Sequence, residues 1–300
     1  MKILNLWYQH NAAFVRHIWE SFAAGANKLG YTTRYIDKGT DPQDIDGINV
    51  IWSMLWQDHM LPNKKVWQTS LYRGEPFIVM DLGALYRYGT YKVAVNGINN
   101  DGYFGPKFND DKRAKKLDLH IREWKSNPNG PIVIAAQNSN SGQFKFFDEQ
   151  MHWTISIMKN IRLHTDRKII LRHHHRHTLE LLWTPNNFEY TECVKEPGTE
   201  TVLPGTDWIT HDKWKFDVDD AYCIINYCSN PSIQAALMGL PLFTTKHSLA
   251  WEVGNLDITN INNPITPDRT QWLNDIAYTE WYPEEIATGE VLDRLIDRNV

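Results

Sequence analysis

The sequence has few of the features that would place a protein outside the globular class. Three cysteines occur in 300 residues, and their odd number and spacing match neither a disulfide framework nor a zinc site. We therefore expect a reduced, cytoplasmic protein. No apolar run reaches the length of about 18 residues that a membrane span requires, so we expect no membrane partner. The opening segment, MKILNLWYQHN, becomes polar too early for a signal peptide and predicts a first strand.

A strong net charge is also missing. The formal charge is −5, and it is unevenly spread, because residues 256–300 hold nine Asp or Glu side chains against three Lys or Arg side chains. The rest of the chain is nearly neutral and has basic clusters within 107–125 and 159–177. An anionic partner is therefore allowed but not required. Hydrophobic residues make up 42% and charged residues 22% of the chain, a composition typical of globular proteins.

What the sequence does contain is a regular alternation of strands and helices. Expected strands cover 2–8, 32–36, 48–55, 76–80, 132–136, 167–171, 188–191, 223–227 and 240–244, and expected helices cover 11–29, 62–72, 111–124, 147–164, 179–183, 231–238, 268–278 and 283–299. This alternation predicts an α/β fold with mostly parallel sheets covered by helices. No GxGxxG sequence follows the first strand, so a nicotinamide or flavin site is not expected. The linker SNPNGP predicts a domain boundary between 1–126 and 131–265.

Residues 221–245 are the stretch on which the functional prediction depends. A buried strand is followed by a polar turn containing Ser229 and Asn230, and then by a short helix that begins at Pro231. Open α/β sheets bind ligands at the carboxyl ends of their strands, and the start of a helix attracts phosphate. An ordinary strand–helix–strand unit without a ligand is the alternative.

The segment SNPSIQAALMGLPLF resembles the donor-binding segment of GT-B glycosyltransferases. The resemblance implies two Rossmann-like domains facing a central cleft, with a C-terminal segment, 266–300, whose helices pack back toward the first domain. It also implies a nucleotide-sugar co-substrate. Ser229, Asn230 and Ser232 would then contact the donor diphosphate, with Tyr227 beside them. Gln234 would contact the ribose, at a position where many family members have Glu.

Residues 172–177, RHHHRH, place four histidines and two arginines after a predicted strand. Consecutive residues of an extended segment point in opposite directions, so the three adjacent histidines cannot converge on one metal ion, and we favour a phosphate or sugar contact. The segment resembles the R-P-H-P-R sequence of capsule-type glycosyltransferases, which implies that Arg172, His174 and Arg176 bind the donor. Gln137, in a polar turn after another strand, is a further donor candidate, with a solvated turn as its alternative.

Asp81 is the first candidate for a general base. It ends a predicted strand, where a carboxylate points toward the ligand crevice; capping of its own turn is the alternative role. His10 and Asp101 are the other candidates. The pairs at 44–46 and 217–219 have the Asp-X-Asp form of metal-dependent transferases, but they precede strands instead of following them. We therefore expect neither a metal nor a resident cofactor.

The segments EPFIVMDLG, YRYG, NGINNDGYF and QWLNDIAYTEWYPEEIATGE resemble phage-encoded glycosyltransferases. This resemblance implies transfer of a sugar from a UDP-sugar to a hydroxy- or hydroxymethyl-pyrimidine in DNA, inside the infected cell. The candidate acceptor-binding residues are Arg87, Asn96, Lys112, Arg113, Lys115 and Lys116, with a solvated helix face as the alternative for the last four. Transfer to a surface or capsule polysaccharide, or non-catalytic binding of nucleotide sugar or DNA, are the alternative functions.

Overall fold

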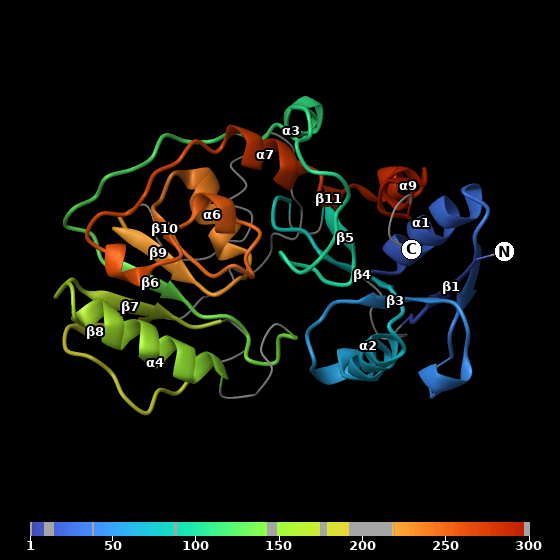
Figure 1. Ribbon diagram of the computed structural model, residues 1–300, viewed down its shortest axis with the longest axis horizontal. Helices are drawn as coiled ribbons and strands as arrows, with labels where there is room; N and C mark the ends of the chain where they lie inside the picture. Colours follow the sequence, from blue (N-terminus) through green and yellow to red (C-terminus); the bar gives the residue numbers. More distant parts are fainter. Residues whose placement is uncertain are drawn as a thin grey trace. The chain divides into compact units, whose positions relative to one another are not determined.

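The computed structural model describes residues 2–8, 15–37, 39–86, 89–142, 149–174, 179–191, 218 and 220–296. The chain forms two compact units, shown in Figure 1. Unit 1 comprises residues 1–109 and 278–300, and unit 2 comprises residues 110–277. These bounds differ from the division predicted at 126–131 and at 265, because the segment 110–126 and the helix that ends at Ala277 belong to unit 2.

Unit 1 is built on a six-stranded sheet in the order β11-β5-β4-β3-β1-β2. Its strands are β1 (Ile3–Leu6), β2 (Thr32–Tyr35), β3 (Ile48–Trp52), β4 (Phe77–Leu82), β5 (Tyr91–Val95) and β11 (Glu280–Trp281). The first four are parallel, whereas β5 runs antiparallel to β4 and β11 runs antiparallel to β5. The prediction of a mostly parallel sheet is thus confirmed in unit 1, with β5 and β11 as its antiparallel strands.

Helices cover both faces of the unit 1 sheet. They are α1 (Arg16–Lys28), α2 (Pro62–Arg73), α8 (Pro283–Ile286) and α9 (Glu290–Ile296). The core beneath α1 includes Trp19, Phe22 and Trp281, all almost completely buried. The short helix α8 packs against α1 at Gly25, where an added methyl group would collide with a backbone carbonyl oxygen. The last two helices of the chain therefore belong to the core of the unit in which the chain begins.

Unit 2 is built on a five-stranded parallel sheet in the order β10-β9-β6-β7-β8. Its strands are β6 (Ile132–Ala135), β7 (Ile169–Arg172), β8 (Phe188–Thr191), β9 (Cys223–Asn226) and β10 (Leu242–Phe243), and its helices are α3 (Lys112–Lys116), α4 (Glu149–Arg162), α6 (Pro231–Met238) and α7 (Thr270–Ala277). Alternate residues of β6 serve opposite faces. Ile132 and Ile134 pack in the core with α4, whereas Val133 and Ala135 face α6.

Three helix predictions were wrong. The segment 111–124 forms only the five-residue helix α3, and the segment 179–183 is not helical. The expected helix over 283–299 is divided into α8 and α9, because Gly289 adopts φ +93° between them. A left-handed residue of this kind ends a helix. No helix in the described parts of the chain is long and apolar enough to cross a membrane.

Candidate active site

The strands at the centre of the unit 2 sheet end at the same level. Ala135 of β6 is paired with Arg172 of β7 on one side and with Asn226 of β9 on the other. From β6 the chain proceeds to β7 and β8, and then returns to β9 on the opposite side of β6. The strand order therefore reverses between β6 and β9, which is where doubly wound sheets form their ligand crevice.

Most of the predicted donor residues meet at this edge. Gln137 follows β6, Arg172 and His174 stand at the end of β7, and the remaining ones lie after β9 or in the first turn of α6. The members after β9 are Tyr227, Ser229, Asn230, Ser232 and Gln234. Arg176 lies outside the described residues. A set of residues spread over about a hundred positions of sequence is thus collected by the ends of three parallel strands.

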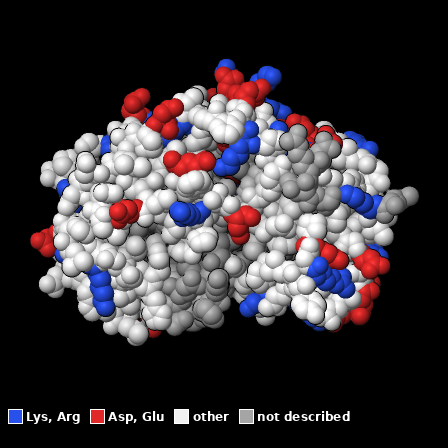
Figure 2. All heavy atoms as spheres, viewed as in Figure 1, with Lys and Arg blue, Asp and Glu red and all other residues white. Residues whose placement is uncertain are grey.

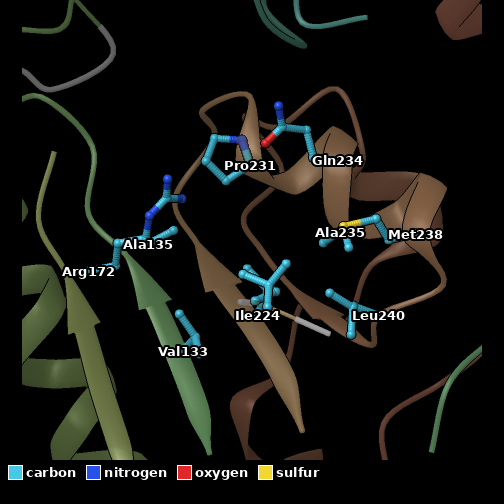
Figure 3. Close-up of a pocket in the computed structure, with 10 residues that line it drawn as sticks. Val133, Ala135, Arg172, Ile224, Pro231, Gln234, Ala235, Met238 and Leu240 are labelled. Atoms are coloured by element: carbon cyan, nitrogen blue, oxygen red, sulfur yellow. The ribbon is translucent and has the colours of Figure 1, made fainter. Parts of the chain in front are cut away.

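A small pocket opens on the α6 side of this edge, as Figure 3 shows. Ala135 and Ile224 form its floor, and Arg172, Pro231 and Gln234 stand around it. Its volume is about 40 Å³, enough for a few water molecules and too small for a whole nucleotide sugar. The pocket can therefore receive one group of a larger ligand.

Arg172 is the charged side chain of this pocket. It is only 6% exposed, and its guanidinium extends along the sheet toward Pro231, at the start of α6 (Figure 3). The positive end of a helix dipole and a guanidinium then lie at the same place. An anion is attracted more strongly in such a partly apolar setting than in water. The pocket is suited to bind phosphate.

The turn before α6 is held by its own hydrogen bonds. The backbone N–H groups of Ser232 and Ile233 donate to the carbonyl oxygens of Ser229 and Asn230, at 3.0 Å each. Asn230 occupies the N-cap position, but its side chain does not cap the helix. The attraction for an anion therefore comes from Arg172 and the helix dipole more than from those two N–H groups.

The two predicted serines of this turn have different positions. Ser229 is half-buried, and its Oγ accepts a 2.8 Å hydrogen bond from Asn226 Nδ2, which also donates to the carbonyl oxygen of Ala135 at 3.0 Å. Ser232 is completely buried, and its hydroxyl contacts the Ser229 carbonyl oxygen at 2.9 Å and Ser248 Oγ at 2.7 Å. Ser229 thus lies at the carboxyl edge of the sheet, whereas Ser232 connects α6 to the loop that follows β10.

Gln137 joins the loops that follow β6 and β9. Its Nε2 donates to Ser141 Oγ at 2.9 Å, and its Oε1 accepts from the Cys228 thiol at 3.2 Å. All three side chains are buried. The sequence offered no sign of the Cys228 contact, since a lone cysteine carries no pattern.

An aromatic cluster borders the same edge. The Tyr227 ring stacks on the exposed His247 ring, with centroids 5.5 Å apart, and meets the edge of Trp153 of α4 at 5.5 Å. Neither Trp153 nor His247 was among the predicted donor residues. His247 follows β10, so its position after a parallel strand was the available signal.

The two described histidines after β7 have different roles. His173 is buried, its ring stacks on Tyr190 at 4.9 Å, and its Nδ1 accepts from the backbone N–H of Leu179 at 3.0 Å. Burial raises the pKa of Tyr190, so that ring stays neutral. His174 is half-buried, and the alternation of an extended segment predicts that it faces the side opposite to His173.

In unit 1, Asp81 stands near the carboxyl end of β4. Its Oδ2 accepts from Ser53 Oγ at 3.1 Å, and its Oδ1 accepts from the backbone N–H of Leu82 at 2.7 Å. The Leu82 contact matches the turn-capping alternative. Ser53 adopts φ +61°, a conformation that non-glycine residues rarely take. The half-buried carboxyl group is thus oriented by a hydroxyl held in an unfavourable backbone conformation.

The structure does not bring Asp101 or Asn96 to Asp81. Both follow β5, and because β5 is antiparallel to β4, they lie at the opposite edge of the sheet. Asn96 Oδ1 accepts from the backbone N–H of Phe77 at 3.1 Å, and Asp101 Oδ1 accepts from the backbone N–H of Asn99 at 3.2 Å. Asn96 therefore joins the end of β5 to the start of β4, and Asp101 supports its own turn. His10 and Arg87 lie outside the described residues.

The basic segment α3 has partners within unit 2. Lys112 contacts Asp110 at 2.9 Å, and Lys115 contacts Asp111 at 2.6 Å. Arg113 is 5% exposed, and its Nε donates to the carbonyl oxygen of Ala277 at 2.7 Å. Lys116 is exposed. The guanidinium of Arg113 thus fastens α3 to α7 and does not face a surface ligand.

Among the described residues, no three His, Cys, Asp or Glu side chains gather to hold a metal ion. Asp44 and Asp46 precede β3, as the sequence indicated. The second Asp-X-Asp pair lies outside the described residues.

Comparisons with known proteins give a fold and no sequence family. No protein-family model and no curated protein matches the chain. Among solved structures, the Thermosulfurimonas dismutans KpsC beta Kdo 2,7 transferase is 13% identical, covers 98% of this chain and 100% of its own, and has a TM-score of 0.51. The KpsC beta Kdo 2,4 transferase of the same organism is 9% identical, covers 92% and 89% of the two chains, and has a TM-score of 0.47. At 13% identity, the first of these similarities shows a shared α/β fold.

Proposed function

We propose that the chain is a glycosyltransferase that moves a sugar from a nucleotide sugar to a hydroxyl group. The observation that carries the proposal is the buried Arg172, which meets the start of α6 at the switch point of a fully parallel sheet. Support also comes from the solved structures of similar fold, which are named as transferases of Kdo, a sugar. The expectation of a GT-B enzyme is retained here as a proposal, with donor binding in unit 2 and proton transfer in unit 1.

The proposed reaction needs two kinds of chemistry. The bond between the sugar's anomeric carbon and the donor phosphate breaks, and the negative charge that develops on the phosphate is stabilised by Arg172 and the dipole of α6. The acceptor oxygen forms a new bond to the anomeric carbon, and its proton passes to the carboxylate of Asp81. General-base catalysis of this kind contributes about 10²–10⁴-fold to a rate.

A carbohydrate, such as a surface or capsule polysaccharide, is the acceptor that we favour. One solved structure of similar fold is named as a beta Kdo 2,7 transferase, which supports an enzyme that handles sugars. Two lysines of α3 that were candidates for DNA phosphate contacts are paired with aspartates. On the face in Figure 2, the described Lys and Arg residues are interspersed with Asp and Glu, with no extended basic patch. Transfer from a UDP-sugar to modified phage DNA stays a prediction, without support from the comparisons.

The test is an incubation of the full chain with a panel of nucleotide sugars and two acceptors, a capsule-type oligosaccharide and hydroxymethylated DNA. We expect release of free nucleotide together with a gain of one sugar mass on the oligosaccharide. The rate should depend little on salt, whereas DNA binding weakens steeply as salt rises. A mass gain on the DNA alone would show that the acceptor is nucleic acid and not a carbohydrate. Binding of nucleotide sugar without any release of nucleotide would indicate the non-catalytic alternative.

A further inference from the structure

Three strands of unit 1 place a row of charged side chains beside Asp81. Asp81 of β4 is directly opposite Lys92 of β5, and Lys92 is directly opposite Glu280 of β11. Both pairings are antiparallel, so the three side chains project from the same face of the sheet, with Cβ atoms of opposite residues about 4.5–5.5 Å apart. The register therefore sets one lysine between two carboxyl groups.

This row is buried. Lys92 is 3% exposed and Glu280 is fully buried. A charge in such a position is stable only when it is paired. Helix α2 packs on the same face beside β3, and its buried residues, Asn63, Val66, Thr69 and Ser70, are uncharged. On the side of β3, the neighbour of Asp81 is the hydroxyl of Ser53. On the two neighbouring strands, the residues directly opposite Lys92 are thus the two carboxylic acids, Asp81 and Glu280.

Glu280 fixes the turn that follows Asp81. Its carboxyl oxygens accept hydrogen bonds from the backbone N–H groups of Ala84 and Leu85, at 2.5 and 3.0 Å, and from Thr90 Oγ1 at 2.7 Å. Gly83 leaves space for this carboxylate, because an added methyl group would collide with it. Glu280 therefore has a structural task of its own, and Asp81 is the carboxylate of the row that stands at the ligand-binding edge.

We propose that Lys92 is a positioning residue of the transfer reaction, which holds Asp81 in its ionised form at the carboxyl edge while Glu280 anchors the adjoining turn. The inference rests on the proposed function, in which Asp81 accepts the proton of the acceptor hydroxyl. A base must be unprotonated before it can act, and a positive neighbour favours the charged form of a carboxyl group.

The experiment follows the Asp81 carboxyl group directly, by NMR titration of the full chain with isotope-labelled aspartate. The resonance that is missing from Asp81→Asn identifies the group. In Lys92→Met, which keeps the length of the side chain, the pKa of Asp81 should rise, making it about a tenfold weaker acid. Lys92→Arg should restore the wild-type titration. Lys65→Met is the matched control, because Lys65 pairs with Asp41 on the surface of the same unit and should leave Asp81 unchanged.

Glu280→Gln tests the same row by shifting the pKa of Asp81 in the opposite direction. Its amide oxygen can still accept hydrogen bonds from the turn, but the competing negative charge is removed, so the pKa of Asp81 should fall. This variant decides the question if Lys92→Met does not fold. An Asp81 titration that is unchanged in the folded variants would overturn the inference. If the titrations shift as expected while Asp81→Asn turns over normally, the charged row stands and the proposed role of Asp81 as the base is wrong.

Discussion

The two sheets of this protein end in edges of different chemistry. In unit 2 the five strands are all parallel, and the described part of the edge collects polar side chains around the buried Arg172. In unit 1 the antiparallel strands β5 and β11 are added beside β4, and they bring a lysine and a glutamate into register with Asp81. In the function that we propose, one edge is the phosphate site and the other supplies the carboxylate for proton transfer.

This difference follows from the strand directions. Parallel strands bring their carboxyl ends, and the loops that follow them, to one edge, which suits a site made of loop residues and a helix terminus. Antiparallel neighbours instead set side chains within the strands directly opposite one another. That arrangement builds the row of Asp81, Lys92 and Glu280. The comparison predicts that mutations at the unit 1 edge alter proton transfer, whereas mutations at the unit 2 edge alter binding of the donor.

Asp81→Asn should have the largest effect. Turnover should fall by about 10²–10⁴-fold, because the amide cannot take up the acceptor proton, while the dissociation constant of the nucleotide sugar stays unchanged. Steady-state rates and calorimetric titration measure the two quantities. Asp101→Asn is the matched control, since Asp101 lies at the opposite edge of the same sheet and its replacement should leave turnover intact. Near-normal turnover in Asp81→Asn would assign the base elsewhere.

Gly83→Ala should destabilise unit 1 by about 1–3 kcal/mol, because its methyl group collides with the carboxylate of Glu280. The corresponding change in unit 2 is Gly130→Ala, where the methyl group would collide with the carbonyl oxygen of Asp220. Hydrogen exchange read by mass spectrometry locates the loss of protection. We expect it in one unit for each variant. Loss of protection spread over both units in either variant would mean that they unfold together.

Ser229→Ala should weaken nucleotide-sugar binding about fivefold, the net contribution of one hydrogen bond of about 1 kcal/mol. Asn226 would lose one acceptor but keep its bond to Ala135. In contrast, Ser248→Ala removes a buried partner of Ser232 and should lower the stability of unit 2 without changing the affinity. Equal affinity losses in the two variants would show that Ser229 acts through the fold and not on the ligand.

Removal of divalent ions should have the smallest effect. Turnover in the presence of a chelator should match that without it, because Arg172 and the dipole of α6 stabilise the phosphate charge. Activity that is lost on chelation and restored by added Mg²⁺ would favour a metal-dependent reaction and direct attention to the pair Asp44 and Asp46.

The donor edge could be predicted because its signals are local. Pro231 at the first helical position and Gly239 after the last one mark the ends of α6, and the structure places them there. The strand before this helix and the strand over 132–136 are short apolar runs, which are typical of buried parallel strands. Residues that follow such strands could be assigned to one edge before any contact was known.

The charged row of unit 1 could not be predicted in the same way. Residues 91–95, YKVAV, were not among the expected strands, and without β5 the position of Lys92 opposite Asp81 cannot be recognised. Glu280 is about 190 positions from Lys92 in the sequence, and it lies in a two-residue strand that is too short to show a periodic pattern. For the same reason, Asp101 and Asn96 were grouped with Asp81, although the direction of β5 separates them. The basic, amphipathic pattern over 111–124 predicted too long a helix, because Asp118 adopts φ +49° directly after the C-cap residue Leu117.

The central claim is that the carboxyl edge of the unit 2 sheet binds the phosphate groups of a nucleotide sugar. The most direct measurement is calorimetric titration of UDP into the wild-type chain, into Arg172→Met and into Lys168→Met. Arg172 ends β7, whereas Lys168 immediately precedes the same strand and pairs with Glu189 at the opposite edge. We predict that Arg172→Met weakens binding by about 30-fold or more, the effect of removing a buried charged partner, and that Lys168→Met binds as the wild type does. Equal affinities in all three proteins would contradict the claim.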